Sequence, residues 1–253
     1  MPAPDYGFRV ASFNIRNDVD RYPERKPLLV SAFAGLSADL VGLQEVRLEG
    51  DRQDDLLAAA APEHRLLSFD ARYERHPDYG IAVLAGIGQV LAHETLPLSH
   101  GRPAQRVLVA LPGQRTLWFV NVHLYHVVDR PAVRAEQAAA LREWMAAAPR
   151  ASAIVIAGDF NAPPHEPAYA DMRTAGYRSA SFEANGEEPA VTWPSGIKAP
   201  TMDTDGDPAC LDYIWVHGDI RVEGASIGAN KPAPGDPTLY PSDHFALVAD
   251  LVL

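Results

Sequence analysis

Eight polar residues that can bind a metal ion or move a proton stand where short apolar segments begin or end. The pattern is clearest in Gly-Leu-Gln-Glu-Val, Gly-Asp-Phe-Asn and Ser-Asp-His-Phe. The ends of strands and the adjoining loops are where side chains gather into functional sites on a rigid scaffold. The eight residues are Asn14, Glu45, His123, Asp159, Asn161, Asp212, Asp243 and His244.

These residue types suit the hydrolysis of a phosphate ester. Magnesium prefers hard oxygen ligands and keeps several waters, so one or two carboxylates are enough to hold it. Phosphoryl transfer also requires an in-line nucleophile and neutralisation of the charge on the phosphate oxygens. A histidine held by a carboxylate can orient or deprotonate the attacking water, because its ordinary pKa of about 6.5 lies near neutrality.

The segments that must position these residues alternate between strands and helices. Apolar runs predict strands at 8–15, 40–43, 66–69, 81–84, 107–111, 117–122, 154–157, 211–216 and 245–253. Helical spacing predicts helices at 24–36, 51–61 and 131–148. Segments 183–210 and 228–243 are rich in Pro, Gly and Asp, and we expect surface loops there. The pattern indicates an α+β protein with layered sheets and helices outside them.

Composition and charge narrow the classes of protein. The 253 residues, 47% of them hydrophobic, fit a single domain over residues 1–253. No apolar run approaches the roughly 20 residues of a membrane span. The N-terminus lacks the pattern of a secretory signal, so we expect a cytoplasmic protein. The net charge of −11, without a basic stripe, disfavours a duplex nucleic acid as partner.

The six segments that carry the eight residues, in this order, resemble the endonuclease/exonuclease/phosphatase superfamily of deoxyribonuclease-like, metal-dependent phosphoesterases. The most specific part is Gly-Asp-Phe-Asn at 158–161, followed by Leu-Asp-Tyr at 211–213 and Ser-Asp-His at 242–244. The resemblance implies a four-layer α/β sandwich, in which two mainly antiparallel sheets pack face to face with helices outside. It also implies an Mg²⁺-dependent hydrolase of phosphate esters, with Mn²⁺ as an alternative ion.

The resemblance also implies which residues would face the metal and the phosphate. Glu45 would be the principal metal ligand. Asn14 and Asp243 would help to hold the metal or its waters. His123 would bind the scissile phosphate or protonate the leaving group, and Asn161 would contact the phosphate or the transition state.

The remaining roles concern the attacking water. By the same resemblance, Asp159 would orient or activate this water, and Asp212 would orient His244. His244 would then be either the general base or an imidazolium that stabilises the phosphate. The sequence does not decide whether Asp159 or His244 removes the proton.

The sequence departs from the family pattern at several points. Many relatives carry Arg or Lys just before the Leu-Asp-Tyr step, where this chain has Cys210, so one cation on the phosphate side is missing. Many also use a mid-chain glutamate to orient the first histidine, and Asp78 is the candidate here. Trp193 lies in a loop that often flanks the pocket of relatives, where it would either pack in the loop or stack on a substrate ring. The acidic segment 203–207 would repel a polyanion or bind a second cation.

The motifs leave more than one function open. We favour a small molecule or a lipid head group as substrate because of the acidic charge, while a DNA or RNA nuclease would use the same catalytic set. A binding protein without catalysis would lack a member of the set, and none is missing. No protein partner is predicted. The other histidines are expected to be structural or on the surface, with His126 also a candidate to line the pocket: His64, His76, His93, His100, His126, His165 and His217.

Overall fold

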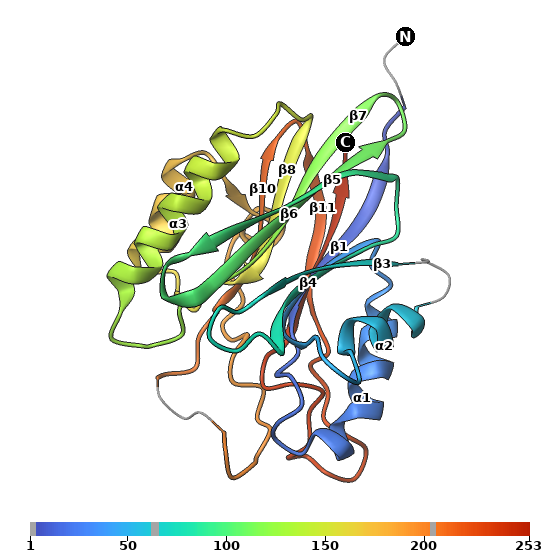
Figure 1. The fold of residues 1–253 in the computed structure, drawn as a ribbon, viewed down its shortest axis with the longest axis vertical. Coiled ribbons are helices and arrows are strands. Elements are labelled where there is room, and N and C mark those ends of the chain that lie inside the picture. Colours follow the sequence, from blue (N-terminus) through green and yellow to red (C-terminus); the bar gives the residue numbers. More distant parts are fainter. Residues whose placement is uncertain (1–3, 62–65, 203–205) are drawn as a thin grey trace.

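The computed structural model describes residues 4–61, 66–202 and 206–253. Within these residues, two six-stranded sheets lie face to face, and helices cover their outer faces (Figure 1). In each sheet, one pair of described neighbouring strands is parallel and the other pairs are antiparallel. The expected four-layer sandwich of two mainly antiparallel sheets is confirmed.

The first sheet has the strand order β11–β12–β1–β2–β4–β3. Helices α1 (Tyr22–Leu36) and α2 (Gln53–Ala59) pack on its outer face through a cluster that includes Leu29, Phe33 and Leu57. Its strands are β1 (Gly7–Asn14), β2 (Leu40–Arg47), β3 (Leu67–Arg72), β4 (Tyr79–Ala85), β11 (Arg221–Gly228) and β12 (Ala246–Val252).

The second sheet has the strand order β5–β6–β7–β8–β10–β9. Helices α3 (Pro131–Ala146) and α4 (Pro167–Thr174) cover its outer face, and α5 (Ala180–Asn185) follows β9. Among the described residues, no helix is both long and apolar enough to cross a membrane. The strands are β5 (Gln89–Leu98), β6 (Arg102–Leu111), β7 (Arg115–His123), β8 (Ala153–Asp159), β9 (Arg178–Ser179) and β10 (Asp212–Gly218), and the short 3₁₀ turn η1 (Ser99–Gly101) precedes β6.

An apolar core lies between the two sheets. Val10, Phe119 and Ile214 belong to it, and they come from both sheets. Central strands such as β8 are buried on both faces, which explains why they appear in the sequence as continuous apolar runs. Edge strands differ: β5 alternates between exposed and half-buried residues. For this reason β5 and β11 were not predicted, and the short elements α4, α5 and β9 were also missed.

The parallel strand pairs bring the polar strand ends together. Neighbouring parallel strands end at the same edge of a sheet, so β1 and β2 place Asn14 near Glu45, and β7 and β8 pair His123 with Asp159. β10 is antiparallel to β8, and therefore its first residue, Asp212, pairs with the last residue of β8. Segments far apart in the sequence thus meet at one end of the sandwich.

An irregularity in β2 determines where Glu45 points. The pairing of β2 with β4 shifts between Leu43 and Val46, and Glu45 has a φ of 54°, which is uncommon for a residue other than glycine. From the opposite sheet, the amide of Asn121 donates hydrogen bonds to the carbonyls of Leu43 and Ala82, each at 2.8 Å. Asn121 therefore supports the bulge that carries Glu45.

Replacement of Asn121 by alanine is expected to lower the free energy of unfolding by about 2–4 kcal/mol, because two buried carbonyls would lose their donor. Urea-induced unfolding measures this change. Asn185→Ala is the control, since the Asn185 amide is exposed and donates to the carbonyl of Ala225 at 3.2 Å. Equal losses of stability in the two variants would contradict the assignment.

Candidate active site

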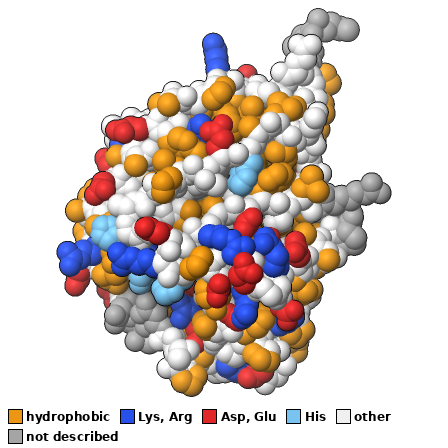
Figure 2. All heavy atoms as spheres, in the orientation of Figure 1, with side chains coloured by type: hydrophobic (Ala, Val, Ile, Leu, Met, Phe, Trp, Pro, Cys, Tyr) orange, Lys and Arg blue, Asp and Glu red, His pale blue; other side chains and the backbone are white. Residues whose placement is uncertain are grey.

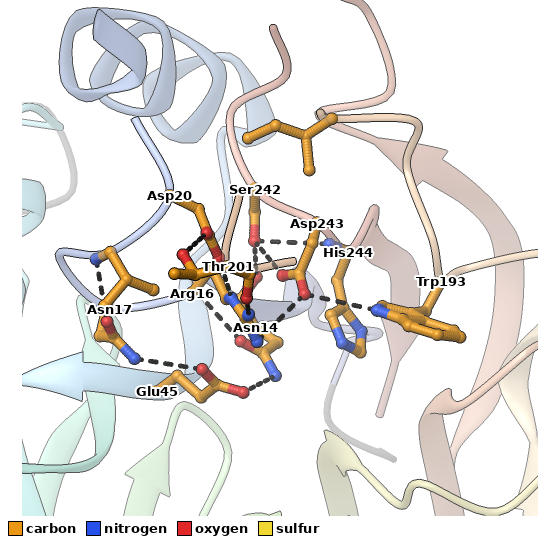
Figure 3. Close-up of polar contacts among 12 residues, drawn as sticks. Asn14, Arg16, Asn17, Asp20, Glu45, Trp193, Thr201, Ser242, Asp243 and His244 are labelled. Atoms are coloured by element: carbon orange, nitrogen blue, oxygen red, sulfur yellow. Dashed lines mark hydrogen bonds and ion pairs between the residues drawn. The ribbon is translucent and has the colours of Figure 1, made fainter. Parts of the chain in front are cut away.

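A cavity of about 1010 Å³ lies at the end of the sandwich where the polar strand ends meet. Asn14 and Asp212 are fully buried and hydrogen-bonded to residues of its wall. Figure 3 shows part of this cluster, with side chains from distant segments pointing toward one another. The other six predicted residues line the cavity: Glu45, His123, Asp159, Asn161, Asp243 and His244.

Asp159 lies at the centre of the cluster. Its Oδ2 accepts a hydrogen bond from Asn14 Nδ2 at 2.9 Å and lies 3.5 Å from His123 Nε2 and 3.7 Å from His244 Nε2. Its Oδ1 accepts a hydrogen bond from the backbone amide of Asn161 at 2.8 Å. Burial raises the pKa of Asp159 to about 7, although the nearby His244 acts to lower it. One carboxylate thus faces two imidazole rings.

His244 is held by carboxylates near both of its ring nitrogens. Its Nδ1 lies 2.8 Å from Asp212 Oδ2, and its Nε2 faces Asp159. Thr192 Oγ1 accepts a hydrogen bond from the backbone amide of Asp212 at 3.2 Å. Burial disfavours the charge on His244, but Asp212, Asp159 and Asp243 outweigh it and raise the pKa of His244 to about 10. We therefore interpret His244 as an imidazolium at neutral pH.

His123 is held in a different way. Its Nδ1 lies 2.7 Å from the hydroxyl of Tyr73 and 3.2 Å from Arg102 Nη1. A guanidinium can only donate, so Nδ1 acts as the acceptor and the ring hydrogen resides on Nε2, which faces Asp159. Burial lowers the pKa of His123 well below its ordinary value, and the charges of Arg102 and His244 lower it further. His123 is a neutral donor toward the cavity.

The mid-chain group expected at Asp78 does not orient this histidine. Asp78 is exposed and is not among the described residues that line the cavity. Tyr73 and Arg102 contact His123 Nδ1 instead, and the Tyr73 hydroxyl also accepts a hydrogen bond from the backbone amide of Glu45 at 3.2 Å. The sequence did not reveal these two residues, because each stands alone at a strand boundary without a motif.

The carboxylate of Glu45 is the acidic group best suited to a metal ion. Its two oxygens accept hydrogen bonds from Asn14 Nδ2 at 3.1 Å and Asn17 Nδ2 at 3.2 Å (Figure 3). In the described part of the chain, no Lys, Arg or His nitrogen lies within 4.0 Å of it. A carboxylate that no ion pair neutralises, on a cavity wall, fits a hard cation such as magnesium.

Asp243 is more fully engaged than Glu45. Its Oδ2 lies 3.5 Å from Arg16 Nη1 and accepts a hydrogen bond from Trp193 Nε1 at 3.3 Å, and its Oδ1 accepts one from Ser242 Oγ at 3.2 Å (Figure 3). Trp193 lines the cavity but is only 8% exposed. Asp243 therefore holds the side chains of Arg16 and Trp193 against the cavity wall.

A second set of metal-binding atoms lies deeper. Asp159, Asp212 and His244 are all buried, and one ligand atom from each lies within 4.8 Å of the others. The 2.8 Å contact between Asp212 and His244 already pairs two of these groups. This buried set and the Glu45 carboxylate both have the chemistry of ligands for a divalent ion. Of the two, we favour Glu45, because its carboxylate has no ion pair within the described residues.

The cavity wall carries more charged groups than the motifs indicated. Cys210, which is uncharged, also lines the cavity, but its side chain is only 2% exposed. Burial raises the pKa of its thiol, as expected of a structural residue. Basic and acidic side chains are interspersed on the lower half of the face in Figure 2. His126, a candidate from the sequence, lines the cavity. Other histidines that were expected to be structural or on the surface also line it, since an isolated histidine gives no spacing signal: His76, His100 and His165.

At neutral pH, His123 is expected to be an uncharged ring with its hydrogen on Nε2. The ¹⁵N chemical shifts of histidine-labelled protein measure the tautomer, and the variant His123→Asn identifies the signals. The physical reason is the donation from Arg102 to Nδ1. A hydrogen found on Nδ1 at pH 7, or a charged ring, would refute this assignment.

Comparison with known proteins identifies the family of this chain. Residues 11–244 match the model of the Endonuclease/Exonuclease/phosphatase family. Nocturnin of Xenopus laevis is 26% identical over 262 residues, which cover 91% of this chain and 64% of that protein. The chain thus spans less than two thirds of the length of this relative.

Solved structures show the same fold. The human Nocturnin catalytic domain with bound sulfate has a TM-score of 0.77 and 20% identity, covering 97% of this chain and 93% of that one. TDP2 of D. rerio complexed with a single-strand DNA product has a TM-score of 0.78 and 17% identity, covering 97% and 98%. An endonuclease/exonuclease/phosphatase from Bacteroides vulgatus has a TM-score of 0.76 and 21% identity, with the same coverage. With a family match over most of its length and this fold, the chain belongs to the endonuclease/exonuclease/phosphatase family.

Proposed function

We propose that this protein is a magnesium-dependent hydrolase of phosphate esters, in which a water attacks the phosphorus in line with the leaving oxygen. Members of its family are hydrolytic phosphoesterases and nucleases. The observation that carries the proposal is the position of Asp159 Oδ2, within 3.7 Å of both His123 and His244, in the cavity that Glu45 also lines. A proton acceptor, a proton donor and a candidate metal ligand thus share one cavity.

Asp159 is the residue that we propose takes the proton from the attacking water. His244 has a carboxylate near each ring nitrogen, so both nitrogens carry hydrogen and neither is free to accept a proton. The charged ring of His244 instead stabilises negative charge on the phosphate, while Asp212 keeps the ring in place. We therefore favour Asp159 over His244 as the general base.

His123 is placed to serve the leaving group. Its hydrogen on Nε2 can bind a phosphate oxygen or pass to the leaving oxygen. Asn161 has a φ of 49°, and its side-chain amide donates to the carbonyl of Leu124 at 3.2 Å. This keeps Asn161 at the cavity wall, where we propose that it contacts the phosphate.

Glu45 is the residue that we propose would bind the metal, and Asp243 would help to hold the metal or its waters. Asn14 donates to both Glu45 and Asp159, so it keeps the two carboxylates in their relative positions. A bound Mg²⁺ supplies positive charge that offsets the charge of the phosphate oxygens. Mn²⁺ accepts the same kinds of oxygen ligand and is expected to substitute for it.

The favoured substrate is a small phosphate ester or a lipid head group, because the net charge is −11 and the cavity wall carries both signs of charge. Single-stranded DNA or RNA is the second candidate. It is favoured by the shared fold with D. rerio TDP2, described as complexed with a single-strand DNA product, and by Tyr125 in the cavity wall as a surface for stacking.

Hydrolysis assays distinguish these two classes of substrate. The substrates are bis(p-nitrophenyl) phosphate, sphingomyelin, inositol phosphates, single-stranded DNA and RNA, each with Mg²⁺, Mn²⁺ or EDTA. No hydrolysis of any ester with either ion would refute the proposal.

Glu45→Gln is expected to weaken the apparent affinity for magnesium by roughly 10- to 100-fold and to lower turnover, since a charged oxygen ligand is lost. A magnesium titration of the hydrolysis rate measures both effects. Glu49→Gln is the control, because Glu49 is exposed and pairs with Arg72. A titration curve of Glu45→Gln that matched the wild type would exclude Glu45 as the ligand.

Asp212→Asn is expected to reduce kcat by roughly 100-fold or more, because His244 would lose the carboxylate that keeps it charged and oriented. The amide has nearly the shape of the carboxylate, so thermal unfolding should change little. Asp219→Asn, at an exposed turn, is the matched control. Full activity of the Asp212→Asn enzyme would remove the proposed role.

A further inference from the structure

Arg102 is a cation in the cavity wall that contacts two histidines and a tyrosine ring. Its Nη1 lies 3.2 Å from His123 Nδ1, its Nη2 lies 2.7 Å from His126 Nδ1, and its guanidinium lies 5.1 Å from the centre of the Tyr73 ring. Within the described residues, no carboxylate oxygen lies within 4.0 Å of Arg102, whereas Arg16 and Arg134 in the same wall have such partners. The charge of Arg102 is therefore available to an anion.

Further cationic and aromatic side chains surround Arg102. Arg75 lines the cavity and is exposed, and His76 follows it in the same loop after β3. His100 lies in η1, two residues before Arg102, and the centre of its ring lies 4.6 Å from the centre of the Tyr125 ring. These groups come from three segments of the chain, and they lie on the side of the cavity that contains His123.

The segments of this wall are docked against each other. The backbone amide of Glu74 donates to the carbonyl of Gly101 at 3.1 Å, and a Cβ at Gly101 would lie 3.3 Å from that of Glu74. Gly101 has a φ of 72°, so the close approach and the backbone conformation both favour glycine. The acidic residues of the loop between β3 and β4 are Glu74 and Asp78, and both are outside the described lining of the cavity. The wall therefore presents cations to the cavity in a fixed arrangement.

We propose that Arg102, with Arg75 and the histidines beside it, forms a second anion site next to the catalytic centre, so that the preferred substrate carries a second phosphate group. This deepens the proposed function and rests on it only for the identity of the reaction. A guanidinium presents paired donors that match the oxygens of a phosphate, and nitrogen donors in a low-dielectric wall bind such a group strongly. The second phosphate belongs either to a small molecule or to the next nucleotide of a single strand.

Arg102 is the first residue of β6, and its side chain enters the cavity wall from that strand. Because Arg102 contacts His123 directly, the second anion lies beside the phosphate that this histidine serves.

Isothermal titration calorimetry in EDTA tests the site without requiring hydrolysis. The ligands are thymidine 5′-monophosphate, thymidine 5′-diphosphate, thymidine 3′,5′-bisphosphate and the 5′-phosphorylated dinucleotide of thymidine. The wild-type protein is expected to bind at least one two-phosphate ligand roughly tenfold more tightly than the monophosphate. Preference for the diphosphate or bisphosphate identifies a small-molecule source, and preference for the dinucleotide identifies a strand.

Arg102→Gln is expected to reduce this affinity ratio to near one, and Arg102→Lys to an intermediate value. Arg221→Gln, which removes the same charge from an exposed ion pair far from the cavity wall, should keep the wild-type ratio. If Arg102 only orients His123, the affinities of all four ligands change together and the ratio stays constant, which overturns the proposal. Equal affinity of the wild type for all four ligands also overturns it. Tighter binding of two phosphates without any metal-dependent hydrolysis would support the anion site and reject the proposed reaction.

Discussion

The hydrogen bond from Asn14 to Asp159 joins the two sheets at the point where the site is built. Asn14 ends a strand of one sheet and Asp159 ends a strand of the other. The same amide nitrogen also donates to Glu45, so three residues from three strands share one donor group. The relative position of the two sheets therefore determines how the candidate metal ligand, Glu45, lies relative to the candidate base, Asp159.

The protonation states around Asp159 follow from the partners of each ring. His244 lies between carboxylates and carries charge, whereas His123 accepts hydrogen bonds at Nδ1 and is neutral. Two histidines with the same intrinsic pKa are thus driven apart by their surroundings. In the proposed mechanism, this difference would separate a group that stabilises charge, His244, from a group that donates a proton, His123.

Much of this arrangement could be predicted from the sequence, because the central strands are buried on both faces and each ends in a polar residue. That signal located the strands that carry Asn14, Glu45 and Asp159, and the order of motifs indicated the family. It failed at edge strands such as β5, whose exposed residues interrupt the apolar pattern. It also failed for Arg102, since a guanidinium acquires its role from what lies beside it in space, and no spacing along the chain encodes that neighbour.

The bulge at Glu45 links the core between the two sheets to the wall of the cavity. Asn121, buried between the sheets, donates to the carbonyl of Leu43 two positions before Glu45, and Glu45 itself has a left-handed backbone. An ion bound at Glu45, the proposed metal ligand, would therefore act on a backbone segment that the core also holds in place. Occupancy of the cavity and resistance to unfolding are then thermodynamically linked, and substitutions deep in the core can alter ion affinity without touching the cavity.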